Sequence, residues 1–141
     1  MRVRFLFPLM IVLLAFSAGC VRTTSNVLTP GGGSTLALLQ KDFTAMDMRE
    51  AILRACAMRQ WRAFDVSANT IEAKTIIRGR QTVVVLIHYS AAHYYITHKS
   101  STNMGYSRRE DGTFSINRSY NTLVSNLDQA IQAHITQKTA M

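Results

Sequence analysis

The stretch Gln81–Tyr89, QTVVVLIHY, has the strongest β-strand character of any run in this chain of 141 residues. Valine, isoleucine, threonine and tyrosine are all enriched in strands. Turn-forming segments lie on both sides, Arg-Gly-Arg at 78–80 and Ser-Ala-Ala at 90–92. The stretch is therefore predicted to be a strand that tight turns connect to its neighbours.

Three further strands are predicted around it, at residues 61–66, 70–78 and 93–99. In 70–78 the side chains alternate between apolar and polar, which is the period of a strand with one buried face. Only short links separate successive strands, and such links join antiparallel neighbours. The four strands should therefore form an antiparallel meander.

Helices are predicted on either side of the meander, at about 45–59 and 117–137. Thr44 and Asp47 have the spacing of a capping box, and Asn117 is a plausible cap for the second helix. Apolar residues recur at helical spacing in both segments. They are Met48, Ile52 and Ala55 in the first, and Tyr120, Leu123, Leu127, Ile131 and Ile135 in the second, with Ile116 just ahead. The predicted fold class is α+β over residues 44–138, helix-β-β-β-β-helix, with both helices on one face of a four-stranded antiparallel sheet.

The N-terminal segment resembles a bacterial lipoprotein signal peptide. Two arginines precede the apolar run 5–16, which is shorter than the roughly 20 residues needed to span a bilayer. Ser17-Ala18-Gly19-Cys20 resembles a lipobox, so we predict a signal peptide at 1–19 and lipidation of Cys20. There are two alternatives. The segment could be an uncleaved signal anchor, or ordinary cleavage could leave Cys20 as a free thiol.

The segment 20–43 is predicted to be a flexible tether, because residues 21–35 are polar and contain Pro30 and three glycines. The short apolar segment 36–39 could form an edge strand or extend the following helix. Val21 stands where lipoproteins retained in the inner membrane commonly have aspartate. The resemblance therefore implies attachment to the periplasmic face of the outer membrane.

The chain is basic, with a formal charge of +8 that falls to +6 when Arg2 and Arg4 are removed with the signal peptide. Export separates the chain from most nucleic acid, so anionic envelope components are the expected partners. Four arginines at predicted turns and loops are candidate anion contacts. They are Arg78, Arg80, Arg108 and Arg109.

A partner surface is predicted on the sheet face that the helices leave open. It combines apolar and polar side chains, and exposed patches of this kind mark contact surfaces. Its candidate residues are Ile76, Val84, Leu86, His88, His93 and Tyr95. The partner would be an unidentified envelope protein, and coverage by segment 21–43 or by a second copy in a homodimer is the alternative.

The sequence shows no catalytic motif. It contains no Gly-x-Ser-x-Gly or His-Glu-x-x-His pattern, and its histidines do not supply the ligand set of a zinc site. No metal or cofactor is predicted. A triad of Ser101, His98 and an acidic residue can be drawn, but the spacing does not favour it. Asn103 and Tyr106 are expected to hold the polar loop 99–113 in place. Cys56 is expected to be a buried, inert thiol, with an intermolecular disulfide as the alternative.

Four short pieces within residues 48–135 form a recognisable pattern. They are Ala51-Ile52, Trp61, Ser-Thr-Asn-Met-Gly-Tyr at 101–106 and Ile-Asn-Arg-Ser-Tyr-Asn at 116–121. With these pieces, residues 48–135 resemble a group of small, largely uncharacterised lipoproteins of Gram-negative bacteria. The resemblance implies a compact α+β domain in the envelope and brings no activity with it. We expect a non-enzymatic binding module, and the alternative is an envelope hydrolase with its site near loop 99–113.

Overall fold

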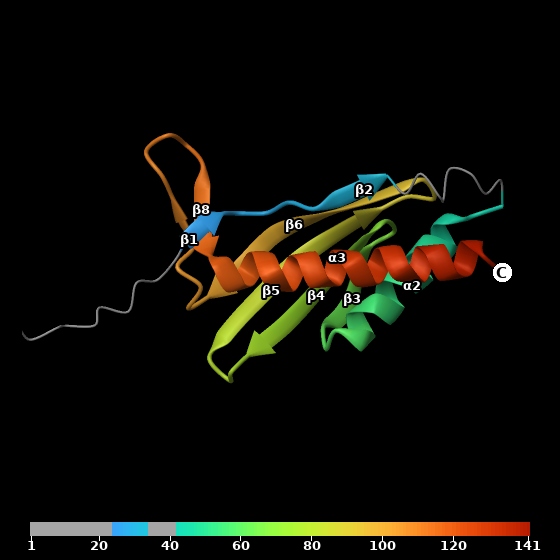
Figure 1. Ribbon diagram of the computed structural model, residues 1–141, viewed down its shortest axis with the longest axis horizontal. Coiled ribbons are helices and arrows are strands. Elements are labelled where there is room, and N and C mark those ends of the chain that lie inside the picture. The colour runs from blue at the N-terminus through green and yellow to red at the C-terminus, as the bar shows by residue number, and fades with distance from the viewer. Residues whose placement is uncertain (1–23, 34–41) are drawn as a thin grey trace, which may run out of the picture.

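The computed structural model describes residues 24–33 and 42–141, and it contains a twisted antiparallel sheet with two helices on one face (Figure 1). The helices are α2 (Ala45–Met58) and α3 (Arg118–Thr139). The main sheet has the order β2-β6-β5-β4-β3. Its strands are β2 (Gly31–Gly33), β3 (Arg62–Ser67), β4 (Thr70–Ile77), β5 (Gln81–Tyr89) and β6 (His93–Thr102). The predicted α+β class, a four-strand meander between two helices, is confirmed.

The core forms between the helices and the inner face of the sheet. Val83, Val85 and Ile87 of β5 are fully buried there. The strand register places Ala73 opposite Val85 and Ile71 opposite Ile87, so the same face of β4 is also apolar. The period-two pattern in the sequence thus directs one side of each strand towards the helices.

Both predicted helix caps are present. The Thr44 hydroxyl accepts a hydrogen bond from the Asp47 amide at 3.2 Å, and the Asp47 carboxylate accepts one from the Thr44 amide at 2.8 Å. At the start of α3, the Asn117 side chain accepts from the Ser119 amide at 3.0 Å. Cys56 on α2 is free and fully buried, as expected, and burial raises the pKa of its thiol to about 12.

Polar contacts at Lys138 and Asp128 hold α3 against the rest of the domain. Lys138, near its C-terminal end, pairs with Asp47 at 2.9 Å and also with Glu50, both at the start of α2. Further along, the buried Tyr94 of β6 donates its hydroxyl proton to Asp128 Oδ1 at 2.6 Å. These contacts orient α3 along the length of the sheet (Figure 1).

The prediction of a flexible tether is wrong for residues 24–33. β1 (Thr24–Asn26) pairs with β8 (Phe114–Asn117), and β2 pairs with β6. Between them, the Pro30 carbonyl accepts a hydrogen bond from Ile96 at 2.8 Å. A polar, glycine-rich segment can gain backbone hydrogen bonds at an open sheet edge, and composition alone does not reveal this. The predicted signal peptide 1–19, Cys20 and segment 36–39 lie outside the described residues.

Part of the predicted loop 99–113 forms strands instead. β6 continues to Thr102, with a β-bulge where Ser100 and His98 face successive residues of β5. The chain then forms a hairpin of β7 (Ser107–Arg108) and β8, and with β1 these make a second sheet of order β1-β8-β7. Ile116 belongs to β8, and α3 begins only at residue 118. Within the described part of the chain, neither helix has the length and apolar character required to cross a membrane.

Candidate binding surfaces

The outer face is the side of the main sheet opposite the helices, and the register places all six predicted partner residues on it. Ile76 and Tyr95 are 61% and 45% exposed, and His93 is also exposed. Leu86 and His88 are half-buried, whereas Val84 is only 9% exposed. The six residues therefore share a face without forming one continuous apolar surface.

An ion pair divides this face. Lys99, at the bulge in β6, pairs with Glu72 of β4. Because β5 lies between those two strands, the pair crosses above Val84 and Leu86. The predicted apolar centre is thus covered by the long stems and charges of Lys99 and Glu72.

Two further exposed apolar side chains lie on β3 itself, and neither was among the predicted partner residues. Phe64 and Val66 are 57% and 51% exposed. A cavity of about 450 Å³ lies next to Phe64, and we call it the β3 groove. It is lined by Gln60, Arg62, Phe64, Lys74, Thr75 and Ile76. The alternation of Arg62, Phe64 and Val66 with their neighbours in the sequence could have indicated that these side chains share one face of a strand. Only the strand order shows that this strand is at the edge of the sheet.

β3 is an edge strand. Among the described residues it pairs with β4 alone, so its second side presents unpaired backbone groups. On the helix side of the same edge, Arg49 of α2 forms an ion pair with Asp65 at 2.5 Å, and exposed Met46 lies beside Ser67 in a hollow of about 330 Å³. Apolar side chains therefore flank the open edge on both faces of the sheet.

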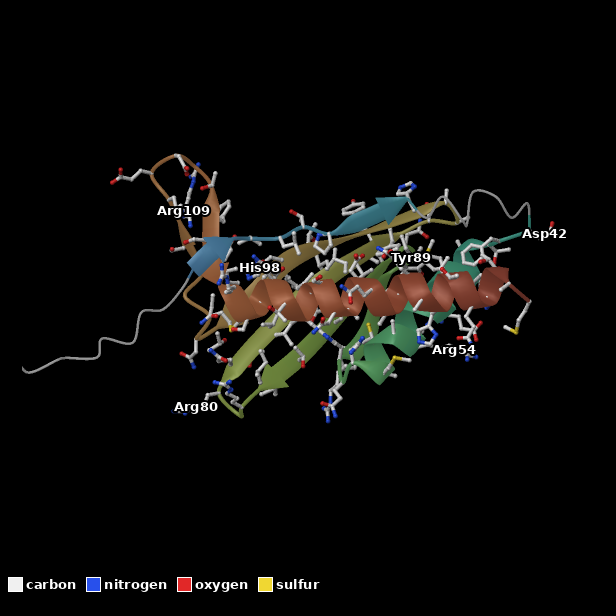
Figure 2. The ribbon with its side chains drawn as sticks, viewed as in Figure 1. Asp42, Arg54, Arg80, Tyr89, His98 and Arg109 are labelled. Carbon is white, nitrogen blue, oxygen red and sulfur yellow. The ribbon has the colours of Figure 1, made fainter. Side chains whose placement is uncertain are left out.

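The four candidate anion contacts occupy two separate places. Arg78 and Arg80 belong to the turn between β4 and β5, whereas Arg108 and Arg109 belong to the β7–β8 hairpin. Figure 2 shows Arg80 and Arg109 at well-separated tips. Hydrogen bonds from Thr113 lower the pKa of the Asp111 carboxylate, and the charge of nearby Arg109 lowers the pKa of Asp111 further. The four arginines therefore do not form one basic patch.

The structure brings His98 and Ser101 together on the inner side of β6. Their Nε2 and Oγ atoms are 3.1 Å apart. The His98 ring stacks on Tyr106 with centroids 4.1 Å apart and meets the edge of Tyr120 at 5.5 Å. Burial lowers the pKa of His98, which favours the neutral imidazole. Figure 2 shows His98 beside the first turn of α3.

These contacts explain how the residues after β6 are held. Asn103 Nδ2 donates to the Arg80 carbonyl at 2.8 Å, and Tyr106 is stacked between His98 and Phe114. The expectation that Asn103 and Tyr106 hold this segment in place is confirmed. A catalytic triad also requires a carboxylate on the second ring nitrogen, and no hydrogen bond of this kind joins His98 to an acidic residue in the described ranges.

The histidines do not gather around a common point. His88 lies directly opposite Tyr95, not His93, and stacks on it with centroids 4.6 Å apart. His93 bonds instead to Ser90 in the β5–β6 turn, at 3.1 Å. Within residues 24–33 and 42–141, no group of three His, Cys, Asp or Glu side chains is placed to hold a metal ion.

Comparison with known proteins gave no match to any family model, curated protein or solved structure.

Proposed function

We propose that this protein is a lipid-anchored, non-catalytic binding module on the periplasmic face of the outer membrane. Its domain binds an extended segment of another envelope protein along β3. The observation that supports this proposal is the coincidence of an unpaired strand edge with an apolar groove at the same place. The anchor rests on the lipobox-like sequence that ends at Cys20.

Strand addition is the recognition mode that fits this edge. A partner strand would form backbone hydrogen bonds with β3, and its alternate side chains would enter the groove beside Phe64 and Ile76. Arg62 and Lys74 supply two positive charges to the groove, and no acidic side chain lines it. The partner segment is therefore expected to combine apolar with acidic residues.

The 3.1 Å contact between His98 Nε2 and Ser101 Oγ favours a competing proposal, that the protein is an envelope hydrolase. A neutral histidine beside a serine hydroxyl is the arrangement of a base and its nucleophile. The same contact also serves to hold the segment after β6, together with the stacking of Tyr106 on His98.

Site-specific photo-crosslinking in living cells tests the binding proposal. A photoreactive amino acid is introduced in the full chain at Phe64, at Ile76 or, as a control, at Gln129 on the exposed side of α3. The first two positions should give the same adduct of defined mass, and the control should give none. Combining Arg62→Glu with Lys74→Glu should abolish the adduct, because it reverses both charges of the groove.

The mass and pattern of the adduct decide between the outcomes. An adduct of twice the mass of the chain would show that the bound partner is a second copy of this protein and not another envelope protein. Equal crosslinking from Gln129, or an adduct that survives charge reversal, would refute specific binding at the β3 groove.

A further inference from the structure

The turn between β4 and β5 holds an arginine in an unfavourable backbone conformation. The Arg80 amide donates to the Ile77 carbonyl at 3.1 Å, and the two central residues, Arg78 and Gly79, have φ of 51° and 67°. Two positive φ angles define the type I′ hairpin turn, for which asparagine and glycine are the preferred residues. A residue with a Cβ atom is strained in this region, because the Cβ atom comes too close to the backbone carbonyl oxygen. Asparagine would form the same turn with less strain, so the local fold does not explain Arg78.

A second segment with positive φ angles faces this turn. Asn103 has φ of 57° and Gly105 has φ of 62°. Asn103 Nδ2 donates to the Arg80 carbonyl at 2.8 Å, while Gln81 Nε2 donates to the Asn103 carbonyl at 3.2 Å. Between the two, Met104 is buried in the core and fixes the segment. The turn and the segment are therefore held in one arrangement before any ligand arrives.

The two segments enclose a polar cavity of about 450 Å³. Its lining consists of Arg78, Arg80, Gln81, Asn103 and Gly105. None of the ion pairs within the described ranges involves Arg78 or Arg80, and no carboxylate lines the cavity. Two arginines thus line a cavity together with the amide-bearing Gln81 and Asn103, and no carboxylate among the lining residues neutralises their charge.

We propose that this cavity binds a phosphate group, the chemistry shared by free phosphate esters and the headgroups of anionic lipids. Guanidinium groups bind phosphate oxygens through paired, charge-assisted hydrogen bonds. The second N–H of each amide, on Gln81 and Asn103, could add a donor. This site shares no lining residue with the β3 groove, so a test of phosphate binding is independent of the function proposed above.

The test uses the full chain in non-ionic detergent micelles, titrated with inorganic phosphate and, separately, with phosphatidylglycerol added to the micelles. Nuclear magnetic resonance should show saturable shifts confined to residues around the cavity. Saturation by inorganic phosphate would assign the site to the phosphate group alone, and saturation by phosphatidylglycerol alone would assign it to a lipid headgroup. An absence of saturable shifts with both ligands would overturn the proposal.

Arg78→Asn is the decisive variant, because asparagine suits the turn but lacks the guanidinium group. It should raise the melting temperature of the protein while weakening phosphate binding by about tenfold or more. Arg108→Gln is the matched control, since it removes an exposed arginine from the separate β7–β8 hairpin. Unchanged binding in Arg78→Asn would show that Arg78 does not hold the ligand and would refute the site. An equal loss in Arg108→Gln would show general charge attraction and would refute it as well.

Discussion

Asn103 and Arg80 are joined by a hydrogen bond of 2.8 Å, from the side-chain amide of one to the backbone carbonyl of the other. The contact links the segment after β6 to the turn between β4 and β5, 23 residues apart in sequence. The two segments line the same basic cavity although they lie apart in the sequence. The same asparagine has a positive φ angle, so its side chain and its backbone can be tested apart.

Asn103→Gly and Asn103→Ala form a matched pair for that test. Both variants lose the hydrogen bond, which contributes about 1 kcal/mol. Only alanine adds the strain of a positive φ angle, roughly 1–2 kcal/mol, because glycine tolerates that region. Urea denaturation should therefore show a larger loss of stability for alanine. Equal losses would contradict the left-handed conformation at this position.

Two buried tyrosines should respond in opposite ways to loss of their hydroxyl groups. Tyr94 donates its hydroxyl proton to the Asp128 carboxylate at 2.6 Å, so Tyr94→Phe should cost roughly 1.5–3 kcal/mol. The Tyr120 hydroxyl is buried without a hydrogen-bond partner in the described part of the chain. Tyr120→Phe should therefore leave the free energy of unfolding unchanged or raise it. The same urea denaturation checks both variants, and a larger loss at Tyr120 would reverse our assignment.

The capping box of α2 should contribute to stability in a pH-dependent way. Hydrogen bonds from Thr44, followed by the contact with Lys138, lower the pKa of Asp47 to about 2. Because the pKa is lower in the folded state, the stabilisation is complete above the unfolded value of about 3.9 and is lost as the pH falls towards 2. Asp47→Asn should flatten this acid limb in urea denaturation measured from pH 5 to pH 2. Asp42→Asn, at an exposed carboxylate, should leave the limb as in the wild type.

The pair of His98 and Ser101 separates the binding proposal from the hydrolase proposal. If the domain only binds, Ser101→Ala should complement a deletion strain as well as the exposed control Ser100→Ala does. His98→Ala should destabilise the fold by roughly 0.5–1.5 kcal/mol through loss of the Tyr106 stack. A Ser101→Ala protein that folds and accumulates normally, yet fails to complement, would favour the hydrolase.

Lipidation at Cys20 predicts where the protein is found after cell fractionation. Cys20→Ser should remain unprocessed or be released from membranes, because several acyl chains are needed for a lasting anchor. Cys56→Ala is the control, since Cys56 is buried in the domain and should not affect the anchor. Acyl labelling and membrane retention of Cys20→Ser at wild-type levels would rule out the lipoprotein proposal.

Local sequence patterns were sufficient to predict the elements that depend only on neighbouring residues. The β-rich stretch 81–89, the alternation in 70–78 and the helical spacing from Tyr120 to Ile135 predicted the central strands and α3, because each pattern has the period of its own structure. Thr44 and Asp47 predicted a cap for the same reason, since a capping box involves residues only three apart.

Features that depend on contacts between distant segments are visible only in the folded chain. Residues 24–33 read as a tether because their few apolar side chains give no strand signal, yet they pair with the exposed edges of β6 and β8. Strand order placed β3 at an edge, and the Lys99–Glu72 ion pair covered the apolar centre that alternation had predicted. The basic cavity required Arg80 and Asn103 to meet. Backbone pairing and long-range contacts of this kind leave no period in the sequence, so only the folded chain reveals them.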